Sequence, residues 1–170
     1  MNLFSKAAVI GAAMLVALPA ASMAGTATGN IQVTANVTSN CTLQVNPLAF
    51  GAYDPLTTNA TTDLTGTTNI GVTCTMGASP QLSVAAANGN TATGGIGTPV
   101  NAAQASSMAL VGGTAASLKL GYTFALSSNT NANAGGISQP FSFPLNGVIA
   151  HAQDVANGSY ADQLVATVSF

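Results

Sequence analysis

Charge is nearly absent from this sequence, and tryptophan is absent altogether. The 170 residues include only two lysines or arginines, four acidic residues and one histidine. Binding a nucleic acid requires clusters of Lys and Arg that neutralise phosphates, so this composition disfavours nucleic acid as a partner. So little charge also protects weakly against self-association. The composition therefore indicates either a small binding module or a chain that assembles with others.

The side chains that catalysis needs are equally sparse. His151 is the single histidine, and its nearest acidic residue in the sequence is Asp154. The chain has no Gly-x-Ser-x-Gly sequence around a nucleophilic serine, and its aspartates lack the spacing of a metal-binding loop. We expect His151 to be a polar residue on or near an edge strand. We also expect a protein that is not an enzyme and binds no metal or cofactor.

The first 24 residues are typical of a secretory signal peptide. Residues 1–6 carry one positive charge, residues 7–20 form an apolar run, and Ser22-Met23-Ala24 resembles a cleavage site. The apolar run is shorter than the ~20 residues that a membrane span needs. We therefore expect cleavage before Gly25 and export from the cytoplasm. The exported chain keeps one lysine, Lys119, and all four aspartates.

The two cysteines, Cys41 and Cys74, predict a disulfide. An exported chain meets an oxidising compartment, where cysteines form disulfides by default. Cys41 shares its alternating face with Leu43, and Cys74 shares its face with Val72, so both thiols are expected to point into one core. A metal site or a redox pair is disfavoured because no CxxC occurs and the one histidine is distant. The bond should stabilise the fold by about 3–4 kcal/mol.

After residue 24 the hydrophobic pattern predicts an all-β protein. Residues 118–126 place an apolar side chain at every second position. Strands are expected at residues 31–37, 41–45, 67–75, 81–86, 117–126, 147–151 and 160–170, with weaker ones at 108–111 and 141–143. Pro140 and Pro144 restrict the last of these to a sheet edge. Residues 87–107 and 127–138 are expected to be solvated loops. Many short strands separated by turns indicate a sandwich or barrel.

Both ends of the exported chain carry strand patterns without a hairpin partner. Near the C-terminus one face is shared by Leu164, Ala166, Val168 and Phe170. Near the start, polar residues alternate with Ile31, Val33, Ala35 and Val37. One strand thus needs a neighbour, and another has no turn that ties it into a hairpin.

Three stretches carry a family pattern in their order and spacing. They are Cys41-Thr-Leu through Pro47-Leu-Ala-Phe-Gly-Ala-Tyr-Asp-Pro55, Gly71-Val-Thr-Cys-Thr-Met-Gly-Ala78, and Gly158-Ser-Tyr-Ala-Asp-Gln-Leu-Val-Ala-Thr-Val-Ser-Phe170. Together they resemble the spore-coat-protein-U-like pilins of the archaic (Csu-type) chaperone–usher pathway. The resemblance covers nearly the whole chain after residue 24. The sequence departs from the family pattern after Leu126, where the family often carries Tyr-x-Asp and basic residues.

The resemblance implies a fold and a mode of assembly. Residues 39–170 would form an incomplete immunoglobulin-like β-sandwich that lacks its last strand and is completed by donor-strand complementation. Residues 25–38 would be the donor strand, inserting Ile31, Val33, Ala35 and Val37 into a neighbouring copy. The acceptor groove would be lined by Leu164, Ala166, Val168 and Phe170 on one side, and by Leu43 and Val45 on the other.

The resemblance also implies partners and a location. The partners would be neighbouring pilin subunits, a periplasmic chaperone and an outer-membrane usher, with no other membrane contact. The chain would pass through the periplasm to a pilus on the cell surface or to the extracellular space, and would support adhesion and biofilm formation. One alternative is a secreted binding module, for example for carbohydrate, which the shortage of aromatic side chains disfavours. Another is a spore-coat or cell-coat protein that polymerises by the same mechanism.

Overall fold

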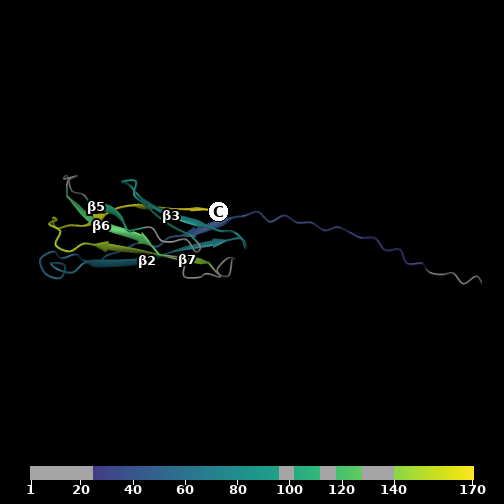
Figure 1. Ribbon diagram of the computed structural model, residues 1–170, viewed down its shortest axis with the longest axis horizontal. Helices are drawn as coiled ribbons and strands as arrows, with labels where there is room; N and C mark the ends of the chain where they lie inside the picture. Colours follow the sequence, from purple (N-terminus) through teal and green to yellow (C-terminus); the bar gives the residue numbers. More distant parts are fainter. Residues whose placement is uncertain (1–24, 96–101, 112–117, 128–139) are drawn as a thin grey trace, which may run out of the picture. The chain divides into compact units, whose positions relative to one another are not determined.

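The computed structural model describes residues 25–95, 102–111, 118–127 and 140–170 (Figure 1). Within these ranges all regular secondary structure is β-strand, which confirms the all-β prediction. None of the described residues forms a helix long and apolar enough to cross a membrane. The expected signal peptide lies outside the described residues, as does nearly all of the expected loop at 127–138. Residues 1–35 and 36–170 are two separate units, and every strand belongs to the second.

The strands form two antiparallel sheets, and their packing is that of an immunoglobulin-like sandwich. The larger sheet has the spatial order β1-β2-β7-β6-β5-β8. Its strands are β1 (Cys41–Gln44), β2 (Leu64–Cys74), β5 (Gln104–Leu110), β6 (Lys119–Leu126), β7 (Phe141–Ile149) and β8 (Tyr160–Ala161). The smaller sheet has the order β4-β3-β9, with β3 (Gln81–Ala86), β4 (Thr91–Gly95) and β9 (Leu164–Ser169). In Figure 1 the C-terminal end of the chain runs beside β3.

The core lies between the sheets and follows the period-two pattern of the sequence. Every second side chain of β6 and β7 is buried, so each strand has one core face. The largest fully buried side chains include Phe124, Phe141 and Phe143. From the smaller sheet, Leu82 and Val84 complete the packing.

Several predicted strands match the structure, and one was missed. The prediction for β3 is confirmed residue for residue, and β2 begins three residues earlier than expected. β4 lies inside a segment that was expected to be a loop, so that part of the prediction was wrong. β4 pairs with β3 across its whole length. Its five residues, Thr-Ala-Thr-Gly-Gly, carry little hydrophobic signal.

The prediction that proline restricts residues 141–143 to a sheet edge was also wrong. β7 is continuous through Pro144 and lies between β2 and β6. The Pro144 carbonyl accepts a hydrogen bond from the Ser127 N–H at 2.8 Å, so this side of Pro144 faces β6. The N–H that proline lacks would point the same way, to a position just beyond the last pair, Leu126 with Leu145. Pro144 therefore has little effect on the hydrogen bonding between β6 and β7.

The C-terminal stretch expected as one strand is divided between the two sheets. β8 pairs with β5 in the larger sheet, and β9 pairs with β3 in the smaller one. Asp162 and Gln163 form the crossing between them. The crossing brings the last strand of the chain to an edge of the smaller sheet.

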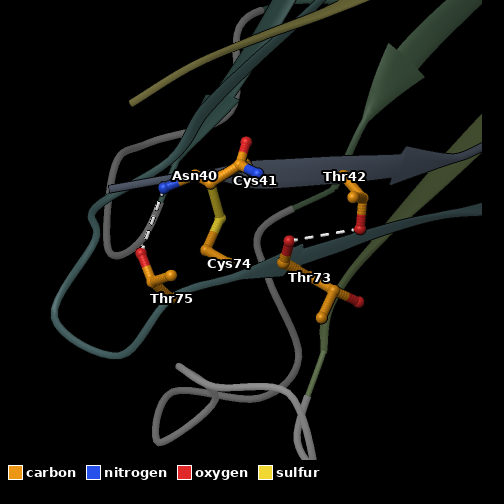
Figure 2. Close-up of a disulfide and its surroundings, with 6 residues drawn as sticks. All are labelled: Asn40, Cys41, Thr42, Thr73, Cys74 and Thr75. Carbon is orange, nitrogen blue, oxygen red and sulfur yellow. Dashed lines mark hydrogen bonds between the residues drawn. A yellow bond between two sulfur atoms is a disulfide. The ribbon is translucent and has the colours of Figure 1, made fainter. Parts of the chain in front are cut away.

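The predicted disulfide between Cys41 and Cys74 is present (Figure 2). The two cysteines are direct partners in the pairing of β1 with β2. Beside them the Asn40 N–H donates to Thr75 Oγ1 at 3.1 Å, and the Thr75 N–H donates to the Asn40 carbonyl at 2.9 Å. The disulfide thus joins the short edge strand β1, which has only four residues, to the long strand β2.

Candidate functional site

The last strand, β9, has a partner on one side only. It pairs with β3, and among the described residues no strand lies on its other side. The Thr167 carbonyl accepts a 3.4 Å hydrogen bond from Ser83 of β3 and so faces that strand. Because backbone groups alternate in direction along a strand, those of Ala166 and Val168 face the open side. β9 therefore offers an unpaired strand edge.

A cavity of about 720 Å³ lies along this open side. Its walls come from the β1 side, through Leu43 and Val45, and from the β9 side, through Leu164 and Ala166. Core side chains also line the cavity, among them Ile70, Val84, Tyr122 and Leu145. We call this cavity the groove. It is an opening in the sandwich between the edge strand of one sheet and the edge strand of the other.

The four residues predicted to line an acceptor groove are distributed unevenly along it. Leu164, Ala166 and Val168 are partly buried and alternate with exposed residues, as the pattern indicated. Leu164 and Ala166 line the groove, whereas Val168 and Phe170 lie beyond its lining. Phe170 is 56% exposed, which contradicts the inward position expected for it. It follows the last pair of the ladder, Ser169 with Gln81, and so has no strand beside it.

The N-terminal segment carries the apolar residues predicted to insert into a neighbour. Ile31, Val33 and Val37 are 90%, 88% and 81% exposed, and Ala35 is exposed as well. The strand predicted at residues 31–37 is not formed. A strand is stable only with a neighbour that pairs with its backbone, and residues 31–37 pair with no strand in the described part of the chain.

A carboxylate lies at the end of the groove where the chain crosses between the sheets. The hydroxyls of Tyr122 and Ser106 donate to Asp162 Oδ2 at 2.7 and 2.8 Å, and the Gln163 N–H donates to Oδ1 at 2.8 Å. Burial, together with the hydrogen bond to Asp162, raises the pKa of the Tyr122 hydroxyl, which stays a neutral donor. Asp162 thus links the crossing to β5 and β6. The sequence signal for this role is the Gly-x-Tyr-x-Asp motif that ends at Asp162.

Phe50 lies at the same end of the groove, in a notch formed by two glycines. Gly66 of β2 and Gly147 of β7 are direct partners in the larger sheet. A Cβ added to Gly147 would come within 2.5 Å of Phe50 Cζ, and one added to Gly66 within 2.9 Å of the Ala49 carbonyl oxygen. Only glycine at both positions lets residues 48–50 pack so closely on the sheet.

His151 has an acid partner, but not the one that the sequence suggested. Its ring Nδ1 lies 2.6 Å from Asp63 Oδ1, and its backbone N–H donates to the same oxygen at 2.9 Å. Asp154, the nearest acidic residue in the sequence, is not this partner. The hydrogen bonds from His151 lower the pKa of the Asp63 carboxyl. Both side chains are about half exposed, so this is a hydrogen-bonded pair on the surface.

Acidic, histidine and cysteine side chains do not gather into a metal site in the part of the chain that the structure describes. Among the described residues no three of them lie close enough to hold an ion. The lining of the groove is mainly apolar, with polar side chains from Asn46, Asp162 and Gln163.

Comparison with known proteins gives a consistent result. A family model described as the Spore Coat Protein U domain matches residues 27–167. The chain is also 32% identical over 178 residues to Protein U of Myxococcus xanthus, and the alignment covers 96% of each chain. The family match begins within the N-terminal segment and ends within β9.

Proposed function

The chain belongs to the spore coat protein U family, and from this premise we propose that it is a structural subunit of a surface fibre built by donor-strand exchange. The observation that carries the proposal is the open edge of β9 beside an apolar groove. The same chain holds an exposed segment with apolar residues at every second position. The segment of one copy would complete the sandwich of the next.

The physical basis is strand addition. The backbone of the incoming segment pairs with β9, while Ile31, Val33, Ala35 and Val37 enter the groove. Burying three or four aliphatic side chains is worth roughly 5–10 kcal/mol before the cost of ordering the segment. The contact is head-to-tail, because the segment and the groove are different surfaces of one chain. Head-to-tail contacts produce a filament when the rotation from one copy to the next does not close a ring.

The open groove also explains why such a subunit would need helpers before assembly. An unpaired strand edge beside exposed apolar side chains promotes aggregation. A periplasmic chaperone that occupies the groove, and an outer-membrane usher that exchanges it for the next copy, would prevent this. The location would then be the cell surface, as a pilus that supports adhesion and biofilm formation.

A coat protein is the second candidate, favoured by the family's description and by the relative named Protein U. It shares the polymer mechanism and differs in where the polymer is laid down. The low charge of the chain suits either role, since copies that pack together repel each other little.

An electrophoresis experiment on material sheared from the cell surface tests the proposal. Donor-strand polymers should give a ladder in SDS without boiling and a single band after boiling. Antibody labelling of whole cells and of isolated coats then separates the two candidates. Monomer alone under both conditions would contradict a polymer and favour a secreted binding module.

A further inference from the structure

Two cavities meet at the end of the groove where the chain crosses between the sheets. The second cavity, of about 780 Å³, lies between residues 48–56 and 155–160. The residues that line both cavities separate one from the other, and we call them the wall: Leu48, Phe50, Met108 and Tyr160. The wall therefore lies where the groove and the second cavity adjoin.

The Phe50 side of the wall is supported from two directions. Its ring rests on the notch made by Gly66 and Gly147. It also meets the ring of Tyr122 edge to face, with centroids 5.8 Å apart and an angle of 66° between the planes. Such aromatic contacts favour one orientation of both rings. Phe50 therefore has little freedom to move out of the path of an incoming strand.

The Tyr160 side of the wall is held as firmly. Its hydroxyl donates to the Ala156 carbonyl at 2.9 Å, and its backbone pairs with Leu110 of β5. Two residues further on, Asp162 binds Tyr122, the same ring that supports Phe50. Both sides of the wall are thus connected through one buried side chain.

A donor segment with a repeated pattern needs such a stop. Ile31, Val33, Ala35 and Val37 follow one another at steps of two. A slip of one residue would turn the apolar side chains to solvent, but a slip of two keeps them facing the groove. Alternation therefore selects the face of the donor strand and leaves its position along β9 unspecified.

We propose that the wall sets the register of the incoming strand by blocking its passage from the groove into the second cavity. The inference rests on the proposed donor-strand function and adds to it the residues that determine alignment. The bulky Phe50 ring stops the donor beside Leu164. Without this ring, the second cavity becomes a continuation of the groove, and the donor can advance by about one pleat, or two residues.

Cysteine cross-linking in fibres of the full chain measures the register. Thr34→Cys places a thiol on the polar face of the donor segment. It is combined in turn with Gln163→Cys, Val165→Cys, Thr167→Cys or Ser169→Cys, all at exposed positions beside or within β9. Directly opposed cysteines on neighbouring strands can form a disulfide. The readout is a ladder that survives boiling and collapses on reduction.

With the wall intact, one partner should give most of the cross-linked product. Phe50→Ala should move the main product two residues toward Gln163, or divide it between two partners. Met108→Ala, at the other side of the wall, should act in the same direction. Met76→Ala is the matched control, because Met76 is 87% exposed and lines neither cavity, and it should leave the register unchanged.

The outcomes separate the two levels of the proposal. A single register that is the same in Phe50→Ala, Met108→Ala and the control would overturn the register stop while leaving donor-strand exchange in place. Loss of fibres in both wall variants would show that the wall serves folding, and would also overturn it. Absence of any cross-link between copies with the wall intact would contradict the proposed function itself.

Discussion

The outer edges of β5 and β9 are both strand edges, but only one of them is covered. β8 pairs with the end of β5 at Ala109 and Leu110. Further along β5, the Ala105 carbonyl accepts hydrogen bonds from the side-chain amides of Asn88 and Asn90, at 2.9 and 2.6 Å. No comparable cap on the open side of β9 is found among the described residues. The outer edge of β5 is therefore covered, whereas the open side of β9, where a partner would bind, is not covered by the described residues.

The direction of the Ala105 carbonyl follows from the pairing nearby. The Val111 N–H donates to the Ser159 carbonyl at 2.7 Å, so the backbone of Val111 faces outward from the sheet. Backbone groups alternate along a strand, so Ala105 faces the same way. The two amides occupy an acceptor to which another chain could otherwise bind. The contrast shows that the outer edge of β5 is covered, whereas the open side of β9 has no strand beside it among the described residues.

The largest effects are expected from a charge placed in β9 or in the N-terminal segment, and the two substitutions should fail at different steps. Val168→Asp puts a carboxylate on the core face of β9, opposite Leu82, and should prevent folding. Val33→Asp changes a residue that is 88% exposed, so its own domain should still fold. Co-purification with a tagged chaperone should therefore be lost for Val168→Asp and kept for Val33→Asp, whereas fibres should be lost for both. The reverse result in the chaperone assay would show that the donor and acceptor roles are assigned to the wrong ends of the chain.

The next largest effect concerns β1, the other rim of the groove. Replacing both Cys41 and Cys74 with serine removes the bond that holds β1 to β2 and should lower the free energy of unfolding by about 3–4 kcal/mol. Urea denaturation of chaperone-released subunit measures the change. A thiol reagent should not label the native, unreduced protein. Labelling of either cysteine would contradict the account of this rim.

A smaller effect is expected when the cap on β5 is removed. Asn88→Ala with Asn90→Ala deletes three hydrogen bonds, two to the Ala105 carbonyl and one from the Asn90 N–H to Asn88 Oδ1, and should cost about 2–3 kcal/mol. The exposed edge should increase aggregation of purified subunit, as followed by light scattering, while the donor cross-link to β9 stays unchanged. Asn69→Ala, an exposed asparagine on β2, is the control. Equal aggregation of the variant and the control would remove the distinction between the two edges.

The smallest effect is expected at the hydrogen-bonded surface pair of His151 and Asp63, to which we assign no role in assembly. His151→Ala should leave fibre assembly intact, since the pair lies on the surface. The pKa of Asp63 is lowered from 3.8, so its pairing adds stability above that pH and loses it as the pH falls through the lowered pKa. The difference in thermal stability between the wild type and His151→Ala should therefore disappear in strong acid. Loss of fibres in this variant would show a role in assembly.

Local sequence patterns predicted the strands in which apolar residues on one face alternate with more polar residues on the other. β6 places Leu120, Tyr122, Phe124 and Leu126 on its buried face, and the alternation alone was sufficient. β4 was missed because a short strand of threonine, alanine and glycine has no such contrast. The division between β8 and β9 was also missed, since the alternation continues through Asp162 while the hydrogen-bonding partner changes from β5 to β3.

The candidate site could be predicted only in part, for the same reason. Leu164 and Ala166 were found because they lie on one face of a strand. The position of Phe50 depends on a glycine pair whose members are brought together by sheet pairing, Gly66 with Gly147. The partner of His151 is 88 residues away in the sequence, beyond the reach of any local pattern. Contacts of this kind follow from topology.

A mixing experiment tests the central claim, donor-strand exchange between two different surfaces of one chain, most directly. Val33→Asp disables the donor, and Ala166→Trp fills the groove, where the open cavity has room for the indole. Each variant, purified separately from the periplasm, should remain monomeric in SDS without boiling; Val33→Asp is purified with its chaperone, whereas the filled groove of Ala166→Trp needs none. Mixed after purification, they should give a dimer and nothing larger, because only one of the two possible contacts can form. Polymers from either variant alone, or no dimer from the mixture, would contradict the account.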